Sequence, residues 1–282
     1  MADSSASPPL VSVVMATYAG DEFANVRKAI ASILAQTHRH LELLVCLDGS
    51  YPRERVEYLD RLRKDDPRVR VLSLPENRGP AAARNAAIDQ AAGEYIAIFD
   101  ADDLAAPERI ERQIAYLREH DLDLAGTFMH YIDDHDAIVG RKTMPVSPEQ
   151  LRRTAFFLNP INNPTAFAKA DVFKSHRYDE RFRRGQDYHL WARLVAQGYR
   201  LGNMPEYLHS LRRGSGFLSR RNHIYFWVEL HARTILLKMY PWYLRPVMAP
   251  LVLMLASLRL MPPSVLRGIY KLRGRMQWRS TQ

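Results

Sequence analysis

Four short apolar segments in the first hundred residues alternate with helical patterns. They lie at residues 10–17, 41–47, 69–73 and 94–99, and helical patterns are clearest at about 22–34 and 81–92. Strands that alternate with helices at this spacing predict a right-handed parallel α/β sheet. The turns that follow the strands then lie together at the carboxyl edge of the sheet, where open α/β sheets bind their ligands.

The fourth apolar segment ends in a cluster of acids, Asp100, Asp102 and Asp103. Asp100 and Asp102 are two positions apart, so they share a face on an extended chain. Their oxygens suit a hard divalent cation, Mg²⁺ or Mn²⁺, which could neutralise a diphosphate leaving group. Taken alone, the same cluster could be a solvated loop in which Asp103 caps the next helix.

Other polar residues follow the neighbouring strands. Thr17 and Tyr18 end the first strand, Asp48 ends the second, and Arg84 lies on the helix after the third. We therefore expect these side chains to converge with the acidic cluster on one edge. Arg84 could reach a nucleotide there, or it could tie its helix to the acidic turn.

Several motifs taken together resemble one family. They are VSVVMATYAG, LLVCLDGS, ENRGPAAARNAAIDQAAGEYIAIFDADD and YDERFRRGQDYHLWARL. These motifs are similar to those of the inverting glycosyltransferases of family 2, which have the GT-A fold, and the resemblance spans roughly residues 9–213. It implies that Tyr18 and Asp48 hold the base of a nucleotide-sugar and that Asp100 reaches the ribose. It also implies that Asp102 binds a divalent metal, Mn²⁺ or Mg²⁺. Thr17 and Arg84 are further candidates for contact with the nucleotide.

The resemblance implies that Asp187 is the catalytic base. Inversion at an anomeric carbon requires one carboxylate that takes the proton from the attacking acceptor hydroxyl. The leaving diphosphate needs no acid, because a metal and nearby cationic groups stabilise it. Without the resemblance, an acid at this helix start, after Arg181, Arg183 and Arg184, would more simply stabilise the helix terminus.

Two positions depart from the family pattern. Gln186 stands where relatives have Glu, and Gly214 lies near the position of a metal-binding His. His209 lies five residues earlier and is more simply a strand or surface histidine. Arg212 or Arg213 could instead meet the diphosphate. A catalytically inactive GT-A domain that binds a nucleotide-sugar or a glycan therefore remains the alternative to an enzyme.

Two polar segments in the second half have ordinary explanations as well as functional ones. Residues 133–136, DDHD, look metal-binding but most resemble a hairpin turn between two apolar segments. Asn162 and Asn163 could contact sugar hydroxyls, or they could serve the turn in which they lie.

Composition suggests how the chain is divided. Its 282 residues with 47% hydrophobic content are enough for one large α/β domain and an appendage. We expect a disordered leader at residues 1–9 and a GT-A domain at 10–215. Within that domain the nucleotide-binding half is about 10–105 and the acceptor half about 106–215. Residues 216–282 form a helical extension. Cys46 is the single cysteine, and the start of the chain lacks a signal peptide pattern, so a cytoplasmic protein is predicted.

The C-terminal extension is basic and apolar. Residues 207–282 contain thirteen Lys and Arg residues but one acid, Glu229. The longest uncharged stretch, 246–258, is too short to span a bilayer and contains Pro250. Prolines, arginines and Trp227, Trp242 and Trp278 suit an interfacial position on an anionic membrane, at the inner face of the cytoplasmic membrane. Alternatively, these helices pack on the catalytic domain or on a second subunit. The apolar content exceeds what nucleic-acid binding requires.

The sequence thus predicts an enzyme that transfers a sugar from a nucleotide diphosphate donor. The predicted donor is a UDP-sugar, and the predicted acceptor is a hydroxyl of a glycan or lipid-linked saccharide in surface polysaccharide assembly.

Overall fold

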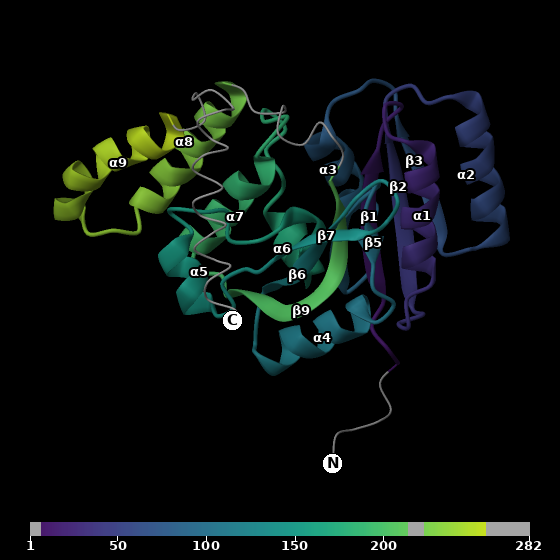
Figure 1. The fold of residues 1–282 in the computed structure, drawn as a ribbon, viewed down its shortest axis with the longest axis horizontal. Coiled ribbons are helices and arrows are strands. Elements are labelled where there is room, and N and C mark those ends of the chain that lie inside the picture. The colour runs from purple at the N-terminus through teal and green to yellow at the C-terminus, as the bar shows by residue number, and fades with distance from the viewer. Residues whose placement is uncertain (1–6, 214–222, 258–282) are drawn as a thin grey trace, which may run out of the picture.

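The computed structural model describes residues 7–213 and 223–257 (Figure 1). Its first half is a parallel sheet in which the strand order is β3-β2-β1-β4. The strands are β1 (Val11–Thr17), β2 (Leu41–Asp48), β3 (Val69–Leu74) and β4 (Tyr95–Asp100). Helices α1 (Phe23–Leu34), α2 (Arg53–Asp65) and α3 (Pro80–Gln90) connect them. All four strands that the sequence predicts are therefore present, and each turn lies at the expected edge.

The second half extends the same sheet with mixed pairing. After β4 the order continues through β8 (Phe167–Lys169), β6 (Leu124–Ile132), β9 (Leu201–Arg212) and β5 (Leu104–Ala105). Strand β8 is antiparallel to both of its neighbours, whereas β6 and β9 are parallel with an irregular register. Strand β7 (Ile138–Lys142) forms an antiparallel hairpin with β6. This half brings the segment 201–212 back beside the acidic turn.

The central strands are covered on both faces, which explains why they are apolar throughout. Val13, Leu43 and Phe99 pack with α1 and with α4 (Arg109–Glu119) on one face. On the other face, Val14 and Leu44 pack with α3, with α6 (Ala170–Ser175) and with α7 (Gln186–Ala196). The layers fix the sheet rigidly beneath its carboxyl edge. Cys46 is buried in this core, as expected for a small apolar residue.

Two local expectations can be compared with the structure. Residues 133–136 do form the turn of the β6–β7 hairpin, where the Asp133 Oδ1 atom accepts hydrogen bonds from the backbone of His135 and Ala137. Asp103, however, does not cap a helix, because α4 begins at Arg109 and its N-cap is Glu108. The Asp103 carboxylate is buried and is used elsewhere.

The C-terminal helices lie at the end of the molecule opposite α1 and α2 (Figure 1). They are α8 (His223–Leu237) and α9 (Arg245–Ser257), joined through the short helix η2 (Trp242–Leu244). Val228, Ala232 and Leu236 of α8 are buried, and α8 packs along α7. Within residues 7–213 and 223–257, the helices are too short or too polar to cross a bilayer. Gly214 and Trp278 lie outside the described residues.

Candidate active site

The carboxyl edge of the parallel strands brings the predicted nucleotide-binding residues together. Thr17, Asp48 and Asp100 end three neighbouring strands, because β1 pairs with both β2 and β4. Thr17 donates a hydrogen bond to the Asp21 carboxylate over 2.8 Å, and the Tyr18 backbone N–H donates to the same carboxylate over 3.0 Å. The loop is therefore held in place while the Tyr18 ring remains 48% exposed. An exposed ring on a fixed loop can stack on a nucleotide base.

Asp48 is buried and organises a second loop. Its carboxylate accepts hydrogen bonds from the backbone N–H groups of Arg78 at 2.8 Å and Gly79 at 2.9 Å. Gly79 has a φ of +92°, a conformation that other residues rarely adopt. Asp48 thus fixes the chain that leads into α3. Each of its oxygens has a further lone pair, so contact with a base remains a prediction.

Arg84 reaches from α3 to the end of β4. Its Nη2 atom donates to Asp100 Oδ1 over 2.6 Å, and only 9% of its side chain is exposed. Its Nε and Nη1 atoms are buried and have no hydrogen-bond partner among the described residues. The predicted tie between the helix and the acidic turn is therefore present. Two donor atoms of Arg84 are therefore left unpaired in this part of the structure. Asn85 does not reach the acidic turn, since its amide bonds the backbone of Tyr178.

Asp102, like Asp100, is a half-buried acid of the cluster, whereas Asp103 is buried. Burial, followed by the negative charges of Asp103, Asp100 and Asp21, raises the pKa of the Asp102 carboxyl group to about 8. Such crowding of carboxylates favours a bound cation. The described residues include no group of three or more metal-ligating side chains. Mg²⁺, and by its similar oxygen preference Mn²⁺, needs no such cage when one carboxylate and substrate phosphates supply the ligands. Asp102 therefore fits a metal that is shared with a diphosphate.

A buried network supports the acidic turn from below. Asp103 accepts a hydrogen bond from the backbone N–H of Arg212 at 2.8 Å, and His209 Nε2 lies 2.7 Å from its other oxygen. Arg109 Nη1 lies 3.0 Å from His209 Nδ1. Arg109 can only donate, so this ring is neutral and carries its proton on Nε2. Burial and the Arg109 charge both lower the pKa of His209. His209 is thus a buried strand histidine, as expected for the simpler of its two interpretations.

Arg212 connects the acidic turn to the β6–β7 hairpin by hydrogen bonds. Its guanidinium donates to the carbonyl oxygens of Asp102 at 3.0 Å and Asp133 at 2.6 Å, and to the Asp136 carboxylate at 2.5 Å. With 3% of its side chain exposed, it joins the acidic turn to the β6–β7 hairpin. The suggestion that Arg212 meets a diphosphate is wrong in this arrangement, because these contacts occupy the group. Arg213 instead lies over the Tyr131 ring, 4.6 Å from its centroid.

Asp187 lies in the first turn of α7, after Gly185 at the N-cap. Burial raises the pKa of its carboxyl group, although the hydrogen bonds that it accepts and the charge of Arg84 oppose this effect. Gly185 has a φ of +71°, and a Cβ atom there would lie 3.1 Å from Val228 of α8. Glycine is therefore required where α7 begins against α8. A half-buried carboxylate with a raised pKa is suited to act as a base near neutral pH.

Two residues beside Asp187 were missed by the sequence reasoning. Asn159 Nδ2 donates to Asp187 Oδ2 over 2.7 Å. Lys142 of β7 donates to Asn162 Oδ1 over 2.5 Å, and burial lowers its pKa to about 8 while Asp187 opposes the shift. Asn159 Oδ1 and Asn162 Nδ2 are buried without partners among the described residues. No sequence signal marks these contacts, which depend on how the loops fold. The side-chain oxygen of Asn163 accepts a hydrogen bond from the Tyr178 hydroxyl at 2.8 Å, so this oxygen is already used within the protein.

A parallel sheet with an acidic turn at its carboxyl edge, extended by a mixed half that carries a second carboxylate, is the arrangement of the GT-A fold. The profile of the family described as glycosyl transferase family 2 matches residues 12–179. The chain belongs to this family.

Individual relatives agree with that placement. An uncharacterized glycosyltransferase of Methanocaldococcus jannaschii is 33% identical over 202 residues, which cover 71% of this chain and 69% of the relative. The amylovoran biosynthesis glycosyltransferase AmsE of Erwinia amylovora is 27% identical, covering 93% of this chain and 98% of the relative.

Solved structures support the fold. TarS 1–349 of S. aureus in complex with UDP-GlcNAc has a TM-score of 0.67 and 18% identity, covering 88% of this chain and 72% of that one. The mannosyltransferase PcManGT of Pyrobaculum calidifontis, solved with GDP-Man and Mn²⁺, has a TM-score of 0.57 and 18% identity. The matched part covers 94% of this chain and 80% of the PcManGT chain.

Proposed function

We propose that the protein is an inverting glycosyltransferase that takes its sugar from a nucleotide diphosphate donor, with UDP-sugars as the favoured class. The acceptor is a hydroxyl group of a glycan or a lipid-linked saccharide. One observation carries the proposal. Arg84 is paired with Asp100 and is also within electrostatic range of Asp187. A single guanidinium therefore joins the nucleotide side of the site to the carboxylate that would act as base.

The chain's own residues divide the reaction between them. Tyr18 and Asp48 seat the base of the donor, with Thr17 holding the loop, and Asp100 meets the ribose. Asp187 takes the proton from the acceptor hydroxyl while that oxygen forms a bond to the anomeric carbon. The bond from this carbon to the diphosphate oxygen breaks on the opposite face, which inverts the configuration. Asn159 holds the Asp187 carboxylate in one orientation through its 2.7 Å hydrogen bond.

Charge on the departing diphosphate also has to be stabilised. Asp102 would hold a divalent cation, Mn²⁺ or Mg²⁺, which when bound neutralises the phosphate oxygens. The unpaired Nε and Nη1 donors of Arg84 are suited to the same oxygens. The solved relatives with UDP-GlcNAc and with GDP-Man and Mn²⁺ support this assignment. The amylovoran biosynthesis role in the name of AmsE supports a place in polysaccharide assembly.

We also propose that the C-terminal helices contact the inner face of the cytoplasmic membrane. Trp242, Tyr243 and Val247 are between 61% and 78% exposed, and Arg245 lies among them. Aromatic and apolar side chains interspersed with cations suit an anionic bilayer surface. A peripheral position would bring the site close to a lipid-linked acceptor.

Release of nucleoside diphosphate from UDP-, GDP- and dTDP-sugars, with and without Mn²⁺, tests the reaction. We expect wild-type protein to release diphosphate from one donor. Asp187→Asn should lower the rate by about 10²- to 10⁴-fold, the usual contribution of a general base, with donor affinity unchanged. Asp102→Ala should remove the Mn²⁺-dependent part of donor binding. Full turnover by Asp187→Asn would place the base elsewhere.

The alternative is a GT-A domain that binds a nucleotide-sugar or glycan without turning it over. Gln186, in place of the family's Glu, is the observation that favours it. Tight donor binding without diphosphate release, across a panel of oligosaccharide and lipid-linked acceptors, would support this alternative.

A further inference from the structure

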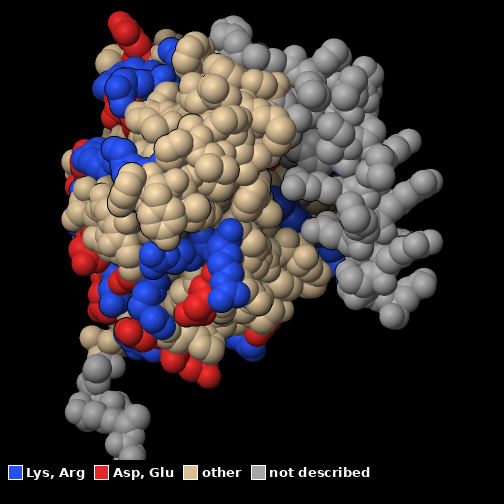
Figure 2. Space-filling model, turned by 90° about the vertical axis from the view of Figure 1, so that its left-hand side faces the viewer, with Lys and Arg blue, Asp and Glu red and all other residues tan. Residues whose placement is uncertain are grey.

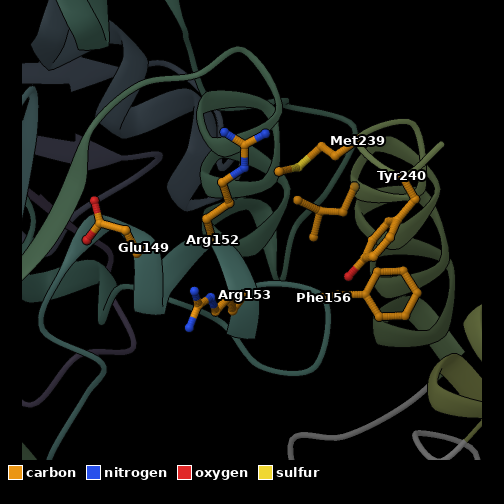
Figure 3. A pocket seen from close by; sticks show the side chains of 7 residues that line it. Glu149, Arg152, Arg153, Phe156, Met239 and Tyr240 are labelled. Atoms are coloured by element: carbon orange, nitrogen blue, oxygen red, sulfur yellow. The ribbon is translucent and has the colours of Figure 1, made fainter.

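A cavity lies away from the carboxyl edge, between α5 (Pro148–Thr154) and the end of α8 (Figure 3). Its volume is about 340 Å³, within the range of roughly 300–1,000 Å³ that is usual for ligand pockets. Phe156, Leu236, Met239 and Tyr240 form an apolar side, and Arg152 and Arg153 of α5 form a cationic side. The pocket is therefore divided into an apolar part and a basic part.

The basic side has no counter-charge in direct contact. Arg152 and Arg153 are exposed, and the described part of the chain gives neither of them a hydrogen bond or an ion pair. Glu149 also lines the pocket and is within electrostatic range of Arg153, but its carboxylate points away from Arg152 and the apolar side chains (Figure 3). Lys238 and Arg245 add positive charge near Tyr240, whose carbonyl accepts from Arg245 Nε at 3.0 Å. The surroundings therefore favour an anion.

The apolar side continues outward along the chain. Tyr240 is followed directly by Pro241 and by Trp242 and Tyr243, which are 78% and 61% exposed. The face that carries α8 and α9 shows a broad uncharged surface, bordered by both basic and acidic side chains (Figure 2). An occupant with an apolar chain could thus extend from the pocket onto this surface, which a free phosphate ion would not use.

We propose that this pocket binds one anionic phospholipid of the membrane. Arg152 and Arg153 hold the phosphate of the head group, while the first part of an acyl chain lies against Phe156, Met239 and Tyr240. The inference rests on the proposed membrane contact and adds a specific lipid site to it. The chain's own residues 258–282 are a poorer occupant, because they carry six Lys and Arg residues and no acid. Arg152 and Arg153 would repel them.

Binding of a soluble lipid tests the pocket without a bilayer. Full-length protein is titrated by calorimetry with monomeric short-chain phosphatidylglycerol, below the concentration at which it forms micelles. We expect saturable binding that is roughly tenfold or more weaker in the double variant Arg152→Gln/Arg153→Gln, since each basic residue near an anionic lipid contributes appreciably. The control Arg61→Gln/Lys64→Gln removes the same charge from exposed positions on α2, at the far end of the molecule, and should bind as wild type does.

Two further ligands separate a lipid site from a general anion site. Short-chain phosphatidylcholine should bind weakly because it lacks the net charge, and inorganic phosphate should bind weakly because it lacks the chain. Equal affinity of both double variants, equal binding of phosphate alone, or no binding of phosphatidylglycerol would each overturn the proposal. Diphosphate release is measured on the same proteins. Lipid binding without release would count against the proposed enzyme activity and leave the lipid site standing.

Discussion

Arg84, Asn159 and Asn162 each contain a buried nitrogen or oxygen atom without a hydrogen-bond partner among the described residues. Such atoms are costly, since an unpaired buried polar group destabilises a protein by about 1–3 kcal/mol. Their position beside Asp187 gives a reason for the cost. Hydroxyl groups both donate and accept, so a sugar can satisfy the Asn159 oxygen and the Asn162 amide together. The proposed binding of a sugar would therefore account for these unpaired atoms.

The charge of Asp187 should reduce stability. Burial raises its pKa above the ordinary value of 3.8, so the folded protein holds this proton more tightly than the unfolded chain does. The ionised form therefore costs stability at pH values above the folded pKa, and the cost disappears below the unfolded pKa. Asp187→Asn should raise the thermal midpoint at pH 7 and have little effect near pH 3.

Asp179 provides a matched control of opposite sign. Its hydrogen bond from Arg181 lowers its pKa, so the ionised form stabilises the fold above the unfolded pKa. Asp179→Asn should lower the midpoint at pH 7, and this loss should fade as the pH falls through the lowered pKa. Thermal unfolding of both variants between pH 3 and 7 measures this. A lower midpoint for Asp187→Asn at pH 7 would contradict the expected cost.

Asn159 is a positioning residue for Asp187. Its hydrogen bond lowers the pKa of the carboxyl group, against the larger effect of burial. Asn159→Ala should reduce kcat by about tenfold to a hundredfold through misorientation, with little change in the KM for the donor. The acid limb of the kcat/KM profile should also move to higher pH, because the pKa of Asp187 rises. Asn159→Ser keeps a donor and should restore part of both effects. An unmoved acid limb would leave Asn159 with a structural role only.

At the scale of elements, the parallel half could be predicted, whereas the strand pairing of the mixed half could not, apart from the β6–β7 hairpin. Strands β1 to β4 are apolar runs with local helical connections, so their order follows from sequence patterns. Strand β5 has two residues, and β9 pairs with β6 through a shifted register that includes Pro205. Those pairings depend on contacts between residues far apart in the chain. The same is true in the site. Asp102 follows a predicted strand, whereas Asn159 comes from a loop and Lys142 from the end of the hairpin strand β7.

Arg212 gives an element-scale prediction, because it joins β9 to the acidic turn and to the β6–β7 hairpin. Arg212→Met leaves the Asp102 and Asp133 carbonyls and the Asp136 carboxylate without this donor. We expect a loss of about 3–5 kcal/mol in the free energy of unfolding, as for other broken buried pairs. Arg112→Met removes an exposed ion pair with Glu206 and should cost about 1 kcal/mol or less. Denaturant unfolding compares the two, and equal losses would show that Arg212 is not a tie.

At the scale of the whole molecule, the C-terminal helices belong partly to the core and partly to the surface. Arg233 of α8 donates to the Phe156 carbonyl at 3.1 Å and is paired with Glu229. Trp242 and Val247, further along, are largely exposed. The packing interpretation therefore holds for α8, whereas membrane contact of the extension stays a proposal. Packing on the domain concerns α8, and the proposed membrane contact concerns η2 and α9.

Two alterations should separate these parts. Deletion of residues 216–282 removes the buried side chains of α8, so we expect aggregation on size-exclusion chromatography. The triple substitution Trp242→Ser/Tyr243→Ser/Val247→Ser changes only exposed side chains. It should leave the thermal midpoint unchanged and reduce sedimentation with anionic vesicles severalfold. A monomeric, stable deletion variant would contradict the assignment of α8 to the core.

Gly185 lies where the helix that carries Asp187, α7, meets the C-terminal helix α8. Its close approach to Val228 means that the first turn of α7, which carries Asp187, is braced between the sheet and α8. A larger side chain at either position would displace the first turn of α7, which carries Asp187. A displacement of α8 would therefore change the packing beside the helix turn that carries Asp187. If a membrane surface and a substrate both favour the same position of α8, each binds more tightly when the other is bound, because coupling between two binding sites is reciprocal.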